Sequence, residues 1–510
     1  GGNATPPVHN PSGSGDTFHK EVVWLGAPAR VWQTVRDTGE LIHQKADVLF
    51  VPDFEFSGPV VNITEKQGQT ISGFGGAFSE ASARVFRELP LDQQQMVLEG
   101  YFGTDGIGYT LGRVDMTGDF ELDNFEDHWV REKRVQVPFV HAANNVLKSQ
   151  GRQLQLLATQ WSPPAWLKTN AKMFPPAHPC LRKMVSATWA QYFVQWVSAY
   201  HREGLPIWAV TVQHASNSDA RSEQCLLTPE EEADFLGSLL GPRLRAAHPE
   251  VRVFFSHHHQ KYAGRWADLL KAHHQALGYA VGIAFQGCSE GDLEAIQQVR
   301  REMPRAELLA TEAVRLRRRW RWHLGATPAS GEWALGEGYA RDIVGDLNAG
   351  SVGWIDWNLI INDESIGPNH VDHVWDAAMN LLVDGEDDTE HEDNVWDAAM
   401  MADLSTGEVH RHPQFYFIGH FSKFVLPHSV HLQSSVLNVP STTSRRRAVR
   451  GGLALKPAQP GACSPGQGLQ STSFLRPDGF VATVVLNCGD EDLAFKLRQG
   501  PRAALASIPP

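Results

Sequence analysis

Eight short apolar runs, separated by amphipathic helical stretches, constrain the middle of this chain more than any other feature. The runs begin near residues 71, 108, 154, 207, 251, 280, 307 and 351, and helical patterns lie between them, as at 187–197 and 230–240. Strands that alternate with helices form parallel sheets, and eight such repeats are the number that closes a (β/α)8 barrel. The sequence therefore predicts an α/β fold with a (β/α)8 TIM barrel over residues 70–407.

A doubly wound open sheet is the alternative arrangement for the same pattern. Such sheets bind a nucleotide at a glycine-rich turn that follows the first strand. No Gly-x-Gly-x-x-Gly sequence follows the first run here, so the pattern favours the barrel.

Strand-like runs at both ends of the chain predict a second domain. They lie at 31–35, 48–51 and 60–63 before the barrel, and at 415–418, 430–433, 481–486 and 495–497 after it. We expect residues 21–69 and 408–510 to form one β-sandwich. Residues 1–20 are rich in Gly, Pro, Ser and Asn, and this composition predicts a disordered tail.

Composition excludes several classes of function. The formal net charge is −13, so no broad basic face is expected for nucleic acid. No apolar run reaches the roughly 18 residues that a transmembrane helix needs. The five cysteines include no Cys-x-x-Cys pair and predict neither a zinc module nor a disulfide framework.

His257 and His259 would share one face of a strand, so a metal site there is an alternative to histidines at the barrel rim.

One local repeat follows the eighth run. The segment 370–379 recurs as 391–400 with the shared ending Val-Trp-Asp-Ala-Ala-Met. We interpret it as a tandem duplication within residues 370–400, in the region where the loops of a barrel form its active site.

Several longer motifs resemble one known family. They include Ser72-Gly-Phe-Gly-Gly-Ala-Phe, Trp161-Ser-Pro-Pro-Ala-Trp-Leu-Lys-Thr-Asn, Trp354-Ile-Asp-Trp-Asn and Gly419-His-Phe-Ser-Lys-Phe. With these motifs in the family's own order, the chain resembles the family-30 glycoside hydrolases, the glucosylceramidase group. The resemblance runs from about residue 22 to the end of the chain. The resemblance implies a barrel with a β-sandwich, no cofactor, and retaining cleavage of a β-glucoside or a glucosylceramide-like glycolipid.

The resemblance assigns roles to individual residues. Glu312 falls on the catalytic nucleophile of the family, and Arg113 on the arginine that orients it and keeps it ionised. Further residues fall on or beside positions that contact the sugar: Asp119, Trp161, Trp357 and Asn358. For the two tryptophans, packing at the barrel rim is the alternative role.

The chain departs from the family where protons are transferred. The family's fourth strand ends in Asn-Glu-Pro, and this chain has His214, Ala215 and Ser216 there. The glutamate of that motif is the acid/base, and alanine has no proton to give. The asparagine, which binds the 2-hydroxyl of the sugar, is replaced by His214. Neighbouring strands also differ: His257-His258-His259 replaces Asp-His-Asn, and Gln286 and Cys288 replace His and Tyr.

The duplicated segment affects one further sugar-binding position. The family places an asparagine there; the first copy of the repeat offers His373, and the second offers Asn394. Either the second copy supplies this contact or the loop has been remodelled.

These residues lead to three functional hypotheses. The leading one is a glucosylceramidase-like hydrolase that is impaired on ordinary substrates because Ala215 replaces the acid/base. The second is a non-catalytic protein that binds a glycan or glycolipid. The third is a working β-glucosidase whose proton comes from His214 or Glu223. Two glycosylation sequons, at Asn3 and Asn62, agree with a secreted or lysosome-like compartment. The sequence predicts no particular activator protein.

Overall fold

The structure is a computed structural model. It describes residues 28–116, 130–172, 179–182, 184–214, 225, 227–288, 292–314, 316–318, 330–362, 394–396, 398–438, 468–489 and 491–510.

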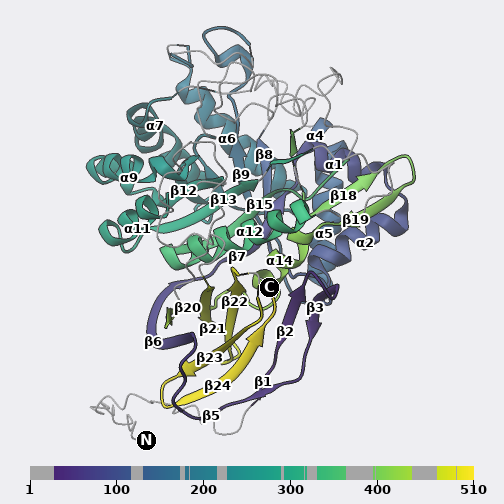
Figure 1. Ribbon diagram of the computed structural model, residues 1–510. Helices are drawn as coiled ribbons and strands as arrows, with labels where there is room; N and C mark the ends of the chain where they lie inside the picture. Colours follow the sequence, from purple (N-terminus) through teal and green to yellow (C-terminus); the bar gives the residue numbers. More distant parts are fainter. Residues whose placement is uncertain are drawn as a thin grey trace, which may run out of the picture.

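Eight parallel strands close into a barrel, which confirms the predicted fold (Figure 1). Around the barrel, the first strand β7 lies between β8 and the last strand β15, so the sheet has no free edge. The strands are β7 (Gly73–Ala77), β8 (Leu111–Met116), β9 (Gln155–Gln160), β10 (Ile207–Thr211), β11 (Arg252–His259), β12 (Ala280–Cys288), β13 (Glu307–Val314) and β15 (Ser351–Asn358).

Amphipathic helices cover the outside of the barrel. In α6 (Ser186–Arg202), the aromatic side chains Trp189, Phe193, Trp196 and Tyr200 recur at helical spacing, and all four are buried. The other α-helices that belong to the barrel domain are α1 (Glu80–Glu88), α2 (Leu91–Phe102), α4 (Val130–Arg134), α5 (Gln136–Ser149), α7 (Pro229–Phe235), α8 (Gly241–Ala247), α9 (Ala263–Ala272), α10 (His274–Leu277), α11 (Leu293–Glu302) and α12 (Ser330–Ala349).

The interior of the barrel changes from apolar to polar along the strands. One apolar layer inside the barrel contains Leu111, Leu157, Ala209, Phe254, Ala284, Leu309, Val352 and Ile355. Successive inward positions on a strand are two residues apart. Beyond Leu111 these positions on β8 are Arg113 and Asp115, so charged groups begin at the C-terminal mouth of the barrel.

The second domain is a seven-stranded sheet to which both parts of the chain contribute. Its strand order is β22-β21-β20-β6-β23-β24-β5, and β6 lies at its centre, antiparallel to β20 and parallel to β23. The strands are β5 (Val51–Pro52), β6 (Val60–Thr70), β20 (Val430–Leu437), β21 (Leu469–Leu475), β22 (Val481–Asn487), β23 (Leu493–Gln499) and β24 (Arg502–Ile508). The predicted β-sandwich built from both ends is thereby confirmed.

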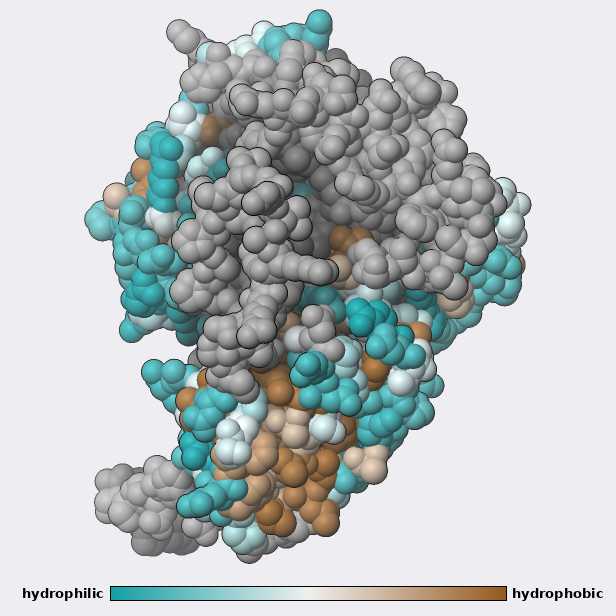
Figure 2. All heavy atoms as spheres, viewed as in Figure 1, coloured by the Kyte–Doolittle hydropathy of each residue, from teal (hydrophilic) through white to brown (hydrophobic). Residues whose placement is uncertain are grey.

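Smaller strand pairs complete the fold. The hairpin of β2 (Trp32–Val35) and β3 (Glu40–Gln44) and the pair β1 (Pro28–Ala29) and β4 (Val48–Leu49) accompany the sandwich. A three-stranded sheet joins β16 (Ile360–Asn362), β18 (Met400–Asp403) and β19 (Glu408–Arg411). Figure 2 shows hydrophobic surface gathered over the sandwich, where Val51, Leu437 and Leu505 are exposed.

The apolar run at 415–418 is not a strand, which corrects the sequence prediction. It lies in helix α14 (Pro413–Ser422), whose buried residues include Phe415, Ile418 and Phe421. These positions repeat every three residues, and Pro413 stands in the first turn, where proline favours helix initiation. A run of only four apolar residues fits a strand and a buried helix equally well.

The expectation of no disulfide framework is also wrong. Cys180 and Cys225 form a disulfide across 45 residues of sequence, with their Cα atoms 5.3 Å apart. Cys488 is disulfide-bonded as well. No helix among the described residues is long and apolar enough to cross a bilayer.

Candidate active site

Two irregularities in the strands turn side chains toward the barrel axis. The pairing of β13 with β12 passes from Ala310–Phe285 to Glu312–Gln286, so Thr311 is an extra residue on β13. A bulge of this kind changes which side chain faces inward. After the inward-facing Leu309, the bulge brings Glu312 rather than Thr311 to the mouth.

A second bulge acts on β11 in the same way. Its pairing with β12 passes from Phe255–Ile283 to His258–Phe285, and Ser256 has a positive φ of 65°. The backbone N–H of Ser256 donates to Glu232 Oε1 on α7, 2.9 Å away, which holds the bulge in place. His257 follows the bulge and is buried beside Glu312.

Glu312 and Arg113 form a buried ion pair at the centre of the mouth. Arg113 Nη1 donates to Glu312 Oε2 across 2.5 Å, and both side chains are 0% exposed. Burial by itself would raise the pKa of Glu312, but Arg113, His214 and His257 outweigh it and hold that pKa well below its ordinary value. Glu312 is therefore a carboxylate at neutral pH. Its other oxygen, Oε1, is buried with no hydrogen-bond partner among the described residues.

The indole of Trp357 supports this ion pair from β15. The guanidinium carbon of Arg113 lies 4.0 Å from the centroid of the Trp357 ring, which is close enough for a cation–π contact. The buried guanidinium thus has the Glu312 carboxylate and an aromatic face as neighbours in place of water.

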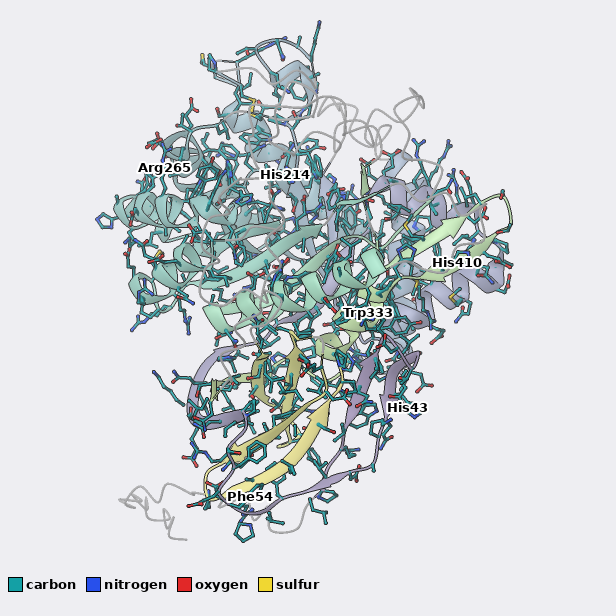
Figure 3. The ribbon with its side chains drawn as sticks, viewed as in Figure 1. His43, Phe54, His214, Arg265, Trp333 and His410 are labelled. Atoms are coloured by element: carbon teal, nitrogen blue, oxygen red, sulfur yellow. A yellow bond between two sulfur atoms is a disulfide. The ribbon has the colours of Figure 1, made fainter. Side chains whose placement is uncertain are left out.

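His214 lies directly against Glu312 on the opposite side of the mouth. Its Nε2 is 3.1 Å from Glu312 Oε2 and 2.9 Å from the side-chain amide of Gln286. The indole of Trp161 stacks on the His214 ring, with centroids 4.1 Å apart and an interplanar angle of 9°. Figure 3 labels His214 among the barrel strands. One face of the Trp161 indole is thus covered by a side chain.

His257 is the third residue in contact with the carboxylate. Its Nε2 lies 3.7 Å from Glu312 Oε2. Burial lowers the pKa of His257 to about 3, so its ring is neutral at physiological pH. The predicted partnership of His257 with His259 does not form, because His259 Nδ1 instead accepts a hydrogen bond from Lys261 N and caps the following 3-10 turn.

Asp115 is a carboxyl group of the mouth that the sequence motifs did not indicate. Its Oδ1 accepts a hydrogen bond of 2.9 Å from Trp161 Nε1 and lies 3.7 Å from Arg113 Nε. Burial raises the pKa of Asp115 despite the nearby cation. Arg113 therefore stands between two carboxyl groups with opposite pKa shifts: the pKa of Glu312 is lowered and that of Asp115 is raised. Asp115 lies two residues after Arg113, and side chains at this spacing on a strand face the same side. This spacing was the sequence signal that could have placed Asp115 at the mouth.

The remaining predicted residues are placed less centrally or are not described. Asn358 follows Trp357, and its Oδ1 accepts hydrogen bonds from Ser79 and Ser82 at the start of α1, at 2.5 and 3.5 Å. Asn394 lies on β17 (Asn394–Trp396), opposite Arg318 of β14 (Leu316–Arg318). Several predicted residues lie outside the described residues: Asp119, Ala215, Glu223 and His373.

The cluster of His214, His257 and Glu312 has the composition of a metal site, but its charges argue against one. One ligand atom from each residue lies within 4.8 Å of the others. The Arg113 guanidinium already binds the carboxylate oxygen that the two histidines face. A divalent cation there would repel this guanidinium in a region shielded from water. The cluster is better suited to a polarised carboxylate than to a metal ion.

A hollow of about 360 Å³ lies at the other end of the barrel. Its lining includes Ser72, Gln155, Arg252, Glu307 and Val352, which lie at the N-terminal ends of the strands. Active sites of barrel enzymes are built at the C-terminal end. We therefore assign the chemistry to the mouth around Glu312.

Comparison with known proteins shows what the chain is similar to. Residues 71–425 match the profile of the glycosyl hydrolase family 30 TIM-barrel domain, and residues 459–510 that of the family 30 beta sandwich domain. The lysosomal acid glucosylceramidase of Mus musculus is 28% identical over 472 residues, which are 88% of this chain and 80% of that protein. An endo-1,6-beta-D-glucanase of Neurospora crassa is 23% identical over 372 residues, covering 70% of each.

A solved structure shows the same fold. SrfJ from Salmonella typhimurium superposes with a TM-score of 0.76 at 23% identity, covering 95% of this chain and 97% of that one. At this identity the likeness concerns the fold alone.

Proposed function

This chain is a member of glycosyl hydrolase family 30, and we propose that its barrel mouth binds the sugar of a β-glucoside, most typically a glucosylceramide-like glycolipid. Glu312 would act as the nucleophile on the anomeric carbon, and no carboxylic acid stands at position 215 to protonate the leaving group. The expected activity is retaining hydrolysis that is weak on ordinary substrates.

The ion pair of Glu312 and Arg113 is the observation that carries this proposal. A buried glutamate would otherwise hold its proton, and a protonated carboxyl group is a poor nucleophile. Arg113 and His214 both bind Oε2, while Oε1 makes no hydrogen bond within the described part of the chain. We assign the attack on the sugar to Oε1, because that oxygen keeps its lone pairs available.

The missing acid affects both halves of the reaction. In a retaining mechanism the acid/base first gives a proton to the departing oxygen and then takes one from the attacking water. With alanine at position 215, alkoxide leaving groups depart slowly, because they need the proton. Activated phenolates depart without it, but water then releases the glycosyl group from Glu312 slowly. General-acid assistance is worth about 10²–10⁴-fold, so the defect is large.

Paired substrates test the proposal. The rates of an activated aryl β-glucoside and an alkyl β-glucoside are measured with and without azide, with Glu312→Gln as the control. We expect turnover of the aryl substrate alone, faster with azide, because azide attacks the glycosyl-enzyme without a general base. Equal rates on both substrates would contradict the proposal.

Binding without catalysis is the second candidate function. The full burial of Glu312 favours it, because an attacking carboxylate must be reached by the sugar. Specific binding of a glucoside, with no covalent adduct on Glu312 from any activated substrate, would support this function over the first.

Asp115 is the described residue that best fits the remaining hypothesis, a relocated acid. Burial raises its pKa, which favours the protonated form that an acid needs, and it lies beside Arg113 at the mouth. Its contacts with Arg113 and Trp161 stabilise the carboxylate that donation would leave behind.

A further inference from the structure

A second cluster of two histidines and one glutamate lies away from the mouth. His201 belongs to the last turn of α6, while His248 and Glu250 belong to the turn between α8 and β11. Both helices lead into the N-terminal ends of neighbouring strands, β10 and β11. The cluster is therefore at the end of the barrel opposite Glu312, and it has no place in the proposed reaction.

The three side chains face one another at distances that do not suit hydrogen bonds. His201 Nε2 and His248 Nδ1 each lie 3.7 Å from Glu250 Oε1, and one ligand atom from each residue lies within 4.8 Å of the others. Hydrogen bonds from nitrogen to oxygen are about 2.7–3.2 Å long. Two equal, longer separations around one carboxylate oxygen leave space for an atom between them.

The hydrogen bond of His248 to Ser198 fixes which ring nitrogen is free. Ser198 Oγ donates its single proton to the carbonyl oxygen of Val194, 2.8 Å away. It must therefore accept the proton of His248 Nε2, which lies 2.8 Å away. With Nε2 bonded to Ser198, Nδ1 is the ring nitrogen of His248 that remains to bind a cation beside Glu250 Oε1, 3.7 Å away.

His201 contributes a second ring nitrogen. Its Nε2 is buried and makes no hydrogen bond to any described residue, and it lies 3.7 Å from Glu250 Oε1. Neutral imidazole is the form that binds metals.

We propose that His201 Nε2, His248 Nδ1 and Glu250 Oε1 form a Zn²⁺ site, with water as the fourth ligand. Zinc binds imidazole nitrogen and carboxylate oxygen at about 2.0–2.2 Å in tetrahedral geometry. Such bonds separate neighbouring ligand atoms by roughly 3.3–3.5 Å, so each 3.7 Å gap needs to close only slightly. Ser198 is the outer hydrogen-bond partner that orients His248 toward the ion, an arrangement common at zinc sites.

Charge distinguishes this cluster from the one at the mouth. Glu312 shares its carboxylate with the Arg113 guanidinium, whereas no lysine or arginine in the described part of the chain forms an ion pair with Glu250. The outer cluster has a net charge of about −1 when both histidines are neutral, which favours a divalent cation. Bound zinc would join the end of α6 to the turn before β11 and stabilise the fold without taking part in catalysis.

Titration of the metal-free full chain with ZnCl₂ by calorimetry tests this site. We expect one Zn²⁺ per chain, and a rise in Tm of about 2–3 °C when free zinc is 100 times Kd. Glu250→Gln and His201→Ala should each weaken binding at least about 100-fold, and Ser198→Ala about 10–100-fold. Glu250 is half exposed, so its substitution tests the site without endangering the fold.

The control is His410, which Figure 3 labels on the β18–β19 hairpin and which lies 4.0 Å from Glu408. His410→Ala should leave zinc binding unchanged, and the glycosidase activity of all these variants should match that of the native chain. The proposal is overturned if the native chain binds no zinc or if Glu250→Gln binds it equally well. It is also overturned if His257→Ala abolishes binding, because the ion would then lie at the mouth.

Discussion

The two sides of the barrel mouth differ in the residues that their strands contribute. On one side, β8, β13 and β15 contribute Arg113, Glu312 and Trp357, and each of the three contacts another. On the other side, the strands β10, β11 and β12 contain no acidic residue. There, His214 Nε2 lies 2.9 Å from the side-chain amide of Gln286 and 3.1 Å from Glu312 Oε2.

Under the proposed function, this difference gives a physical reason for Glu312 to be present without a proton donor. A buried arginine that loses its carboxylate is left as an unpaired charge, which costs about 3–5 kcal/mol. Glu312 and Arg113 therefore support the fold whether or not the protein catalyses a reaction.

Restoring the missing acid should have the largest effect. Ala215→Glu is expected to raise kcat/KM for an alkyl β-glucoside by about 10²–10⁴-fold, because the leaving oxygen again receives a proton. Azide should no longer accelerate the aryl substrate. Ala215→Gln is the matched control, since it adds similar volume without an acid. An absent gain would mean that His214, His257 and Gln286 no longer admit a productive sugar.

Removing the Arg113 cation, on the side of the mouth that contains Glu312, should alter the pH dependence of activity. In Arg113→Gln, only His214 and His257 among the described residues still oppose the effect of burial, so the pKa of Glu312 rises from its lowered value. Activity on the aryl glucoside should fall roughly tenfold for each unit of pKa that lies above the working pH, and it should recover as pH rises. Arg252→Gln is the control, because Arg252 pairs with Glu307 at the other end of the barrel. An unchanged acid limb would contradict the role given to Arg113.

Substituting Glu232, which holds the β11 bulge, should change the stability of the fold rather than the attack of Glu312 on the sugar. Burial raises its pKa to about 8. Between about pH 4.5 and pH 8 the unfolded chain releases this proton while the folded chain keeps it, so stability falls as pH rises. The cost is roughly 3 kcal/mol at pH 7. Glu232→Gln keeps an oxygen to accept from Ser256 and should flatten the change of Tm between pH 5 and pH 8, whereas the exposed Glu230→Gln should not. Equal slopes in the two variants would refute this assignment.

The smallest effect is expected at Asp115. Asp115→Asn keeps an acceptor for Trp161 Nε1, so the mouth should retain its geometry. The ratio of alkyl to aryl activity should then stay nearly constant. A selective loss of about 10²-fold or more on the alkyl substrate would identify Asp115 as a relocated acid, and the two sides of the mouth would no longer differ in chemistry.

Strand periodicity made most of the fold predictable, whereas the local exceptions required the structure. Apolar runs marked all eight barrel strands, but the four-residue run at 415–418 fitted both helix and strand. The disulfide between Cys180 and Cys225 has no local signal, because folding alone brings the two cysteines together. His257 lies beside Glu312, whereas His259 caps the 3-10 turn that follows β11, so the two do not form the expected pair.

The site was predictable where family motifs or strong charges marked it. The pairing of Arg113 with Glu312 followed from motifs that lie about 200 residues apart in the chain. Asp115 was missed, because it belongs to no motif and only its register on β8 places it at the mouth. The outer histidines were missed for a similar reason, since they lie on separate elements that packing brings together.

The most direct test is the mass of the intact chain shortly after mixing with an activated aryl β-glucoside. We predict that one glycosyl unit accumulates on Glu312, because it forms without an acid and leaves slowly without a base, and that azide releases it as the β-glucosyl azide. An unmodified chain, or an adduct on another residue, would contradict the proposal that Glu312 is the nucleophile of a site without a proton donor.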